Sequence, residues 1–205
     1  NLKSLNASDN SKITHVNHLM KLEILNVRFN TCGINNAGIV HCINLKSLYA
    51  SQNPKITNVN HLANLEILDA SFDCGINDAG IVQCINLKSL NASYNSTITN
   101  VNHLVKLEIL GASYNCGIND AEIVQCINLK SLNAMDNPKI TNVNQFAKLE
   151  ILCASGHYCG INDAGIIQCI NLKSLNAFNN SKITNVDHLA KLEILCAVGS
   201  RINNA

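Results

Sequence analysis

The chain has 205 residues, 47% of them hydrophobic, and a formal net charge of +1 from 15 Lys and Arg against 14 Asp and Glu. That length suffices for one domain with a buried core. The near-neutral balance argues against nucleic acid or an anionic membrane as partner, because both attract a surplus of positive charge. The apolar runs fall far short of the roughly 20 residues that span a bilayer, and the first residues carry no signal-peptide core.

An internal repeat organises the whole chain. The segment Asn-Leu-Lys-Ser-Leu begins at Asn1, Asn44, Asn86, Asn128 and Asn171, so the period is 42 or 43 residues. Each copy divides into a shorter unit of 20 residues and a longer unit of 22 or 23. The repeat predicts a single domain over residues 1–205, made of five double units. Because the chain does not begin with Met and stops within the pattern, we expect it to be part of a longer protein.

Both units open with the same phrase, seen as Leu87-x-x-Leu90-x-Ala92-x-x-Asn95-x-x-Ile98 in a shorter unit. The phrase resembles the leucine-rich repeat pattern Leu-x-x-Leu-x-Leu-x-x-Asn/Cys-x-Leu, with Ala in place of the third Leu. The shorter unit is similar to repeats of bacterial internalins, and the longer unit to the cysteine-containing repeats of ubiquitin-ligase adaptors. The resemblance implies an α/β leucine-rich-repeat solenoid, with about ten parallel strands on its concave face and short helices and 3₁₀ turns on its convex face.

Within each double unit, the elements follow in a fixed order. A short strand around the second Leu is followed by a turn, and in the longer unit Asn77 is a candidate N-cap for a helix of about two turns that ends near Cys84. The shorter unit leaves room for a turn or a 3₁₀ stretch only. We expect a buried ladder of hydrogen-bonding side chains after the strands: Asn10, Asn53, Asn95, Asn137 and Asn180 in the shorter units, and Asn30, Asp73, Asn115, His157 and Ser200 in the longer units.

Two further polar columns are predicted to be structural. Lys3, Lys46, Lys88, Lys130 and Lys173 share a column with Glu23, Glu66, Glu108, Glu150 and Glu193, so the charge alternates along the stack and favours correct register. The histidines at 18, 61, 103 and 188 lie about 10 Å apart from copy to copy, which is too far for a shared metal. No metal site, cofactor site or catalytic set is predicted, and we expect no enzyme.

The cysteines form four pairs with a spacing of ten residues: Cys32 and Cys42, Cys74 and Cys84, Cys116 and Cys126, Cys159 and Cys169. Equivalent cysteines in successive copies lie about 10 Å apart, whereas a disulfide needs Cα atoms within about 7 Å. Within one copy the two could meet, but the resemblance implies buried free thiols. Reduced thiols favour a cytoplasmic protein. Four glycosylation sequons leave a secreted or surface-exposed location open.

The positions that differ between copies alternate with the buried Leu and Ala positions. Strand periodicity therefore places them on the solvent side of the sheet. Six of the eight aromatic residues lie in these columns, and every second strand adds an exposed Ile. An apolar and aromatic strip on a rigid sheet is suited to binding a protein. The predicted partner-binding residues are Ile24, Arg28, Phe29, Tyr49, Ile67, Phe72, Tyr94, Ile109, Tyr114, Met135 and Phe178.

These features predict a non-enzymatic scaffold that recognises a protein or peptide on its concave sheet; no small-molecule ligand is expected. Neutral drift would also concentrate variation at exposed positions, although it does not explain the aromatic bias. The alternative is a structural protein that assembles end to end, because neither end shows a distinct polar capping unit.

Overall fold

The computed structural model describes residues 1–203, and within them the chain winds into a solenoid of ten turns. Each turn contributes one three-residue strand, and all neighbouring strands pair in parallel and in chain order. The strands are β1 (Ser4–Asn6), β2 (Ile24–Asn26), β3 (Ser47–Tyr49), β4 (Ile67–Asp69), β5 (Ser89–Asn91), β6 (Ile109–Gly111), β7 (Ser131–Asn133), β8 (Ile151–Cys153), β9 (Ser174–Asn176) and β10 (Ile194–Cys196). The predicted leucine-rich-repeat solenoid is confirmed.

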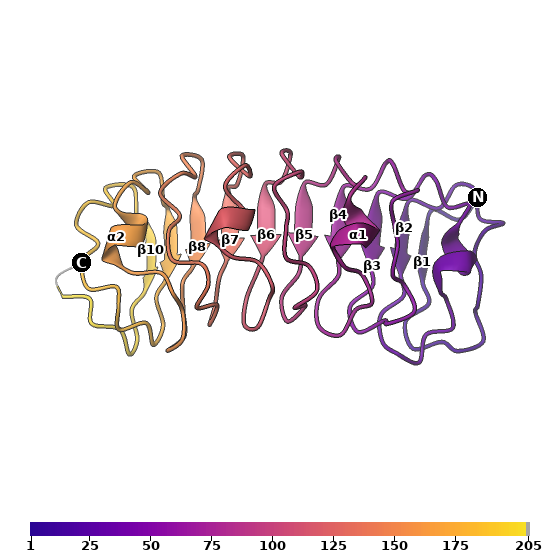
Figure 1. The fold of residues 1–205 in the computed structure, drawn as a ribbon, viewed down its shortest axis with the longest axis horizontal. Coiled ribbons are helices and arrows are strands. Elements are labelled where there is room, and N and C mark those ends of the chain that lie inside the picture. Colours follow the sequence, from indigo (N-terminus) through magenta and orange to yellow (C-terminus); the bar gives the residue numbers. More distant parts are fainter. Residues whose placement is uncertain (204–205) are drawn as a thin grey trace.

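The helical elements occur in the longer units, and Figure 1 looks onto them with the fainter strands behind. They are η1 (Asn36–Ile39), α1 (Asp78–Ile81), η2 (Asp120–Glu122) and α2 (Asp163–Ile166), where η marks a 3₁₀ helix. Asn77 caps α1 as predicted, since its side chain accepts a hydrogen bond from the Gly80 N–H. The expected two-turn helix is wrong: each element is a single turn, because the chain bends immediately towards the next strand. In the described residues the shorter units contain a strand and turns but no helix.

The interior is a continuous apolar core between the sheet and the return segments. In this core, equivalent side chains of successive turns stack on one another. The leucines at the central strand position form one stack, in which Leu48, Leu68 and Leu90 are fully buried, and the Ala residues two positions later form a second stack. Because each unit buries its apolar side only against its neighbours, the stacking of units supplies the stability. All ten cysteines are free, and eight of them belong to this core; Cys153 and Cys196 are half-buried on the outer side of the sheet.

The buried asparagine ladder is confirmed in four of the five shorter units, at Asn53, Asn95, Asn137 and Asn180, and wrong for the exposed Asn10 of the first unit and for the longer units. Asn53 is fully buried, and its amide donates to the Val27 carbonyl at 2.7 Å while its oxygen accepts from the Lys55 N–H at 3.0 Å. In the first longer unit the buried Cys32 occupies this place and donates to the Ala7 carbonyl at 3.3 Å. The turn there is longer, so the residues predicted for the ladder are not buried: Asn30, Asp73, Asn115, His157 and Ser200.

The charged column pairs as predicted along the edge where the strands begin. Lys46 contacts Glu23 at 2.8 Å, and Lys88, Lys130 and Lys173 repeat the contact with the preceding Glu at 2.8 to 3.0 Å. Hydrogen bonds from Lys46 and Lys3 lower the pKa of Glu23 below its ordinary value. Histidines 61, 103 and 188 are half-buried, and each ring Nε2 lies 3.1 to 3.2 Å from a carbonyl oxygen of the preceding unit.

Candidate protein-binding face

The outer side of the sheet, called the sheet face below, carries the predicted partner-binding residues on its strands and on the turns that follow them. Its first column alternates Ser and Ile, since Ser47 pairs with Ile24 on one side and Ile67 on the other. Ile24, Ile67 and Ile109 are exposed, as predicted. Isoleucine therefore recurs on every second strand, about 9.6 Å apart.

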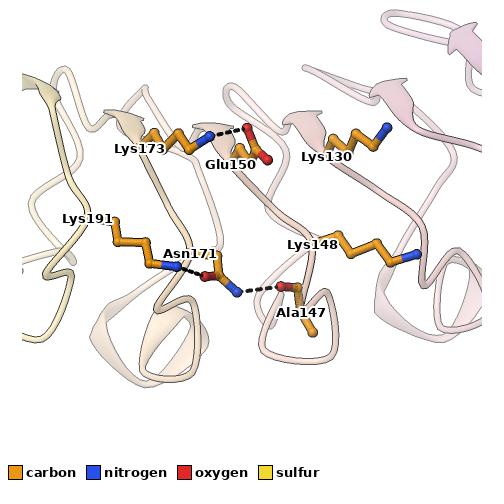
Figure 2. Close-up of a pocket in the computed structure, with 7 residues that line it drawn as sticks. All are labelled: Lys130, Ala147, Lys148, Glu150, Asn171, Lys173 and Lys191. Atoms are coloured by element: carbon orange, nitrogen blue, oxygen red, sulfur yellow. Dashed lines mark hydrogen bonds and ion pairs between the residues drawn. The ribbon is translucent and has the colours of Figure 1, made fainter.

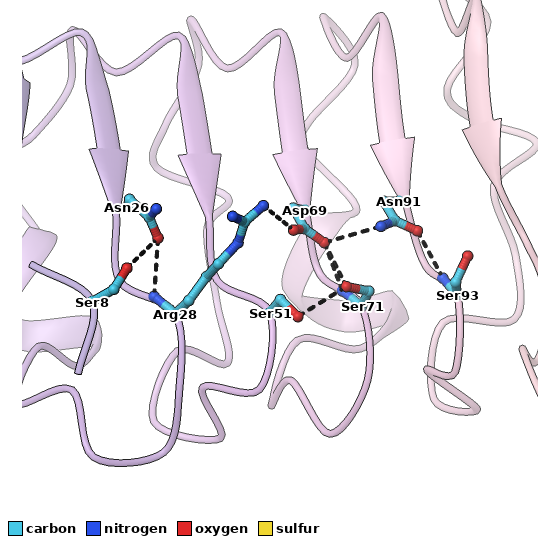
Figure 3. A network of polar contacts seen from close by, with 8 residues as sticks. All are labelled: Ser8, Asn26, Arg28, Ser51, Asp69, Ser71, Asn91 and Ser93. Carbon is cyan, nitrogen blue, oxygen red and sulfur yellow. Dashed lines mark hydrogen bonds and ion pairs between the residues drawn. The ribbon is translucent and has the colours of Figure 1, made fainter. Parts of the chain in front are cut away.

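A polar network occupies the next columns in the N-terminal half, and Figure 3 shows it extending from Ser8 to Ser93. The Arg28 guanidinium contacts the Asp69 carboxylate at 2.8 Å and lies over the Tyr49 ring, 5.0 Å from its centre. Asp69 also accepts a hydrogen bond from the Ser71 hydroxyl at 2.6 Å and one from the Asn91 amide at 3.2 Å. The network fixes Arg28 and Tyr49 in one arrangement across neighbouring strands.

Three aromatic rings stack at the carboxyl ends of the strands. Phe72 and Tyr94 have ring centres 4.8 Å apart and planes within 10°, and Tyr94 and Tyr114 have centres 4.1 Å apart and planes within 18°. These separations are close to the distance of about 4.8 Å between neighbouring strands, so the rings follow the strand repeat. Phe72 and Tyr94 are exposed by about two fifths, at 41% and 39%, so the stack forms an aromatic edge along the rim of the sheet face.

The backbone under this stack is unusual. Phe72, Tyr94 and Tyr114 have φ of 57°, 59° and 58°, and Phe29 has φ of 75°. The same turn position has positive φ in all ten units, and elsewhere it holds residues better suited to that region: Asp9, Gln52, Asp136, Gly156, Asn179 and Gly199. These aromatic residues therefore lie on the turn that follows the strand.

The structure leaves the other predicted residues apart from these two clusters. Phe29 is exposed, and the unit of Gln52 separates it from Phe72. Phe178 is exposed near the C-terminal end, and Met135 is half-buried beside the last stacked ring, its carbonyl accepting from the Tyr114 N–H at 2.6 Å. The sheet face thus contains one polar cluster around Arg28, one aromatic edge and a row of separate isoleucines.

Burial raises the pKa of the Cys74, Cys116 and Cys159 thiols to about 11, which keeps them protonated and poorly nucleophilic at neutral pH. Among residues 1–203, no group of three or more His, Cys, Asp and Glu side chains could hold a metal ion.

Two features were missed from the sequence. Asp69 organises the Arg28 cluster; it belongs to one of the variable columns, and from those columns only aromatic and apolar residues and Arg28 were chosen. The second is an exposed apolar column outside the sheet face, called the ridge below. It lies two residues before the first Leu of each unit, so aligning the two unit types on that Leu would have found it. The ridge consists of Met20, Ile43, Ala63, Ile85, Val105, Ile127, Ala147, Ile170 and Ala190.

Comparison with known proteins connects the fold to solved structures only. No protein-family model and no curated protein matches the chain. An internalin (inlF) from Listeria monocytogenes has a TM-score of 0.73 and 21% identity, with 100% of this chain and 63% of that chain covered. Internalin C2 (inlC2) of the same organism has a TM-score of 0.58 and 19% identity, covering 94% and 79%.

The functional domain of InlJ from Listeria monocytogenes, which includes a cysteine ladder, has a TM-score of 0.53 and 17% identity over 100% of this chain and 55% of that one. This chain thus spans 63% and 55% of the lengths of inlF and the InlJ domain. At this level of identity the likeness concerns the fold. The chain therefore shares the leucine-rich-repeat solenoid fold of these internalins.

Proposed function

We propose that the chain is a non-enzymatic scaffold that binds a protein or peptide on its sheet face, with the aromatic edge and the Arg28 cluster as the main contacts. Solenoids of this architecture generally bind proteins. Aromatic residues and Arg are the side chains that most often dominate such interfaces. The ten free thiols also support the cytoplasm as the proposed compartment.

The single observation that carries the proposal is the backbone under Phe72, Tyr94 and Tyr114. A residue other than Gly in the left-handed region costs about 1–3 kcal/mol, and Asn and Asp tolerate that region better than an aromatic residue does. Four of the ten equivalent turns nevertheless carry Phe or Tyr, with rings that are exposed or half-buried. The stacking that three of these rings add to the fold is offset by the strain of their backbone, so a binding role explains their presence.

The test replaces Phe72, Tyr94 and Tyr114 together by Asn, because Asn179 occupies the same turn position with positive φ in another unit. Lost ring stacking, about 0.5–1.5 kcal/mol per pair, is offset by relief of backbone strain, so we expect a nearly unchanged melting temperature. Partner capture should fall at least 30-fold, since each central aromatic anchor is worth about 2 kcal/mol or more.

Capture is measured from lysate of the source cells, with crosslinks mapped on the scaffold. Tyr158→Asn is the matched control, because Tyr158 is 74% exposed and belongs to none of the sheet-face columns. Crosslinks that map to the helical side, or full capture by the triple variant, would contradict the proposal. A large drop in melting temperature would show that the rings serve the fold.

End-to-end assembly is the second candidate, and the two end surfaces favour it. Apolar hollows of about 430 and 480 Å³ lie at the two ends, one lined by Leu2, Leu5 and Leu19 and the other by Leu189, Leu192 and Leu195. Near the first of these hollows Lys3 contacts Glu23 at 3.0 Å. A second copy placed head to tail would continue the alternation of units and set its Lys3 beside Glu193.

Light scattering of the 205-residue chain over a concentration series tests this candidate. Assembly through these surfaces predicts that the average molar mass rises with protein concentration. Glu193→Lys should abolish this rise, and adding Lys3→Glu to the same chain should restore it. A constant mass at all concentrations would eliminate this candidate. The aromatic edge is remote from both ends, so this result is independent of the test of the sheet face.

A further inference from the structure

The ridge is a second apolar surface, separate from the sheet face. Its larger members are half-exposed: Met20 by 54%, Ile43 by 52%, Ile85 by 54%, Val105 by 50%, Ile127 by 58% and Ile170 by 58%. Neighbouring members belong to successive turns, so the nine positions extend over about 38 Å. Exposed apolar residues at every large position of one column form a continuous apolar line, which isolated surface residues would not do.

A basic row runs directly beside the ridge. The residue after each ridge position is Lys or Asn, with Lys21, Lys106, Lys148 and Lys191 providing the charges. The asparagines support the arrangement, since the Asn171 amide donates to the Ala147 carbonyl at 2.9 Å and its oxygen accepts from the Lys191 ammonium at 2.6 Å. The row therefore has fixed positions along the solenoid.

Between this row and the Lys–Glu column lies a repeated groove. Figure 2 shows one example of about 330 Å³, with Lys130 and Lys173 on one side and Lys148 and Lys191 on the other. Glu150 is the only acidic residue that lines it. An equivalent groove of about 250 Å³ is lined by Lys46, Lys88 and Lys106 with Glu66. Each groove thus carries a surplus of positive charge next to the ridge.

The net charge of the chain conceals this asymmetry. The edge formed by the basic row and the Lys–Glu column carries nine Lys and five Glu, a local charge of +4, while the remainder of the chain carries −3. The absence of a basic tract in the sequence therefore does not describe the folded surface. The fold collects lysines from distant parts of the chain beside one apolar line.

We propose that the ridge and its basic row bind the surface of an anionic phospholipid bilayer. The Ile, Val and Met side chains would enter the boundary between headgroups and acyl chains, and the lysines would contact phosphate and carboxylate groups from the adjoining grooves. Charge complementarity favours this occupant, because a flat anionic surface can meet a positive edge along its full length. None of the helices in residues 1–203 is long and apolar enough to cross a bilayer, so the contact is peripheral.

Sedimentation with vesicles tests the proposal on the 205-residue chain. We expect binding to equimolar phosphatidylcholine and phosphatidylserine, and little binding to phosphatidylcholine alone. Replacing Lys106, Lys148 and Lys191 by Gln should reduce partitioning by about 100-fold. Replacing Ile85, Val105 and Ile127 by Ser should reduce it at least 10-fold, because half-exposed apolar side chains lose their transfer into the interface.

Matched controls separate this surface from the rest of the molecule. The control for charge replaces Lys12, Lys139 and Arg201 by Gln, which removes three positive charges from other parts of the surface. The control for apolar side chains replaces Ile24, Ile67 and Ile109 on the sheet face by Ser. Both control variants should bind vesicles as the parent chain does. Circular dichroism of every variant should match the parent, since all substituted side chains are at least partly exposed.

Four outcomes would overturn the proposal. Binding that survives the ridge variant, or that inorganic phosphate abolishes at equal ionic strength, would indicate a site for free anions. Equal loss in the control variant that lacks Lys12, Lys139 and Arg201 would indicate non-specific charge attraction, and equal loss in the isoleucine control variant would move the membrane contact to the sheet face. Self-association that the ridge variant removes, without vesicle binding by the parent, would assign the ridge to a second copy. Results with the ridge and lysine variants are independent of the proposed sheet-face function, because the sheet-face residues remain intact in both.

Discussion

In a shorter unit a buried amide closes the turn after the strand, whereas in the first longer unit a thiol does so. Asn53 and Cys32 both donate to the carbonyl of the third apolar position in the preceding unit. The amide also donates to Ile34 and accepts from the Lys55 N–H, while the Cys32 thiol donates one weaker bond to the Ala7 carbonyl. The shorter unit therefore ties this turn to its neighbours with more and stronger side-chain hydrogen bonds than the first longer unit does.

The largest effect should come from removing one of these amides. Asn137 donates to the Ala112 and Ile118 carbonyls at 2.7 and 3.2 Å and accepts from the Lys139 N–H at 2.9 Å. Asn137→Ala leaves these buried groups unpaired, so we expect a loss of about 3–4 kcal/mol in the free energy of unfolding. Cys116→Ala, the matched change in a longer unit, should cost about 1–2 kcal/mol. Urea denaturation measures both, and equal losses would refute the difference between the units.

A smaller effect is expected from the helical turns, where the longer units differ among themselves. A Cβ added to Gly80 would lie 2.2 Å from the Thr57 carbonyl oxygen of the preceding unit. Glu122 occupies the equivalent place in another unit, where the turn is a three-residue 3₁₀ helix and Asn119 caps Ala121 instead. The backbone there has already shifted to admit a side chain.

Gly80→Ala should therefore destabilise the protein by about 1–3 kcal/mol, through a steric conflict that the backbone relieves only in part. Glu122→Ala is the control and should change stability by less than about 0.5 kcal/mol. Thermal unfolding followed by circular dichroism distinguishes the two. Similar melting temperatures of the two variants would mean that the backbone of any longer unit can shift to admit a side chain at this position.

The smallest effect concerns alkaline pH. Burial raises the pKa of Cys84, Cys116, Cys126 and Cys169 from 9.0 to about 11. The unfolded chain releases these protons more readily, so their contribution to stability is complete below pH 9.0 and declines as the pH rises towards about 11. The urea midpoint should fall over this range. A variant with Cys116→Ala and Cys126→Ala should show a shallower decline, and an unchanged slope would mean that other groups titrate.

The sequence predicted the strands, the parallel order and the amide ladder because these depend on a period that recurs ten times. It failed where a turn changed length. In the longer units the turn has one or two additional residues, which place Asn30 and Asn115 outside the core. Counting three residues from the third apolar position, Val27 or Ala112, therefore no longer identified the buried residue. The left-handed turn at Phe72 was hidden for a different reason, because an aromatic residue is a poor indicator of positive φ.

The Arg28 cluster and the ridge required packing between units. Arg28 and Asp69 are 41 residues apart and meet only because their strands are separated by one neighbour. Ile43 and Val105 appear unrelated when the unit types are considered separately, yet they lie in one column of the solenoid. Features that repeat within one unit type could therefore be predicted from the sequence, whereas features formed by neighbouring units of both types became visible only in the structure.

The alternation of Lys and Glu along the strand-initiating edge also limits how the gene of such a protein can change in length. Loss of one shorter unit, such as the one that contains Lys88, would place Glu66 beside Glu108, and like charges on neighbouring strands destabilise a sheet. Loss or duplication of a double unit of 42 or 43 residues would restore every Lys–Glu contact. Copy number in this lineage should therefore vary in steps of two turns.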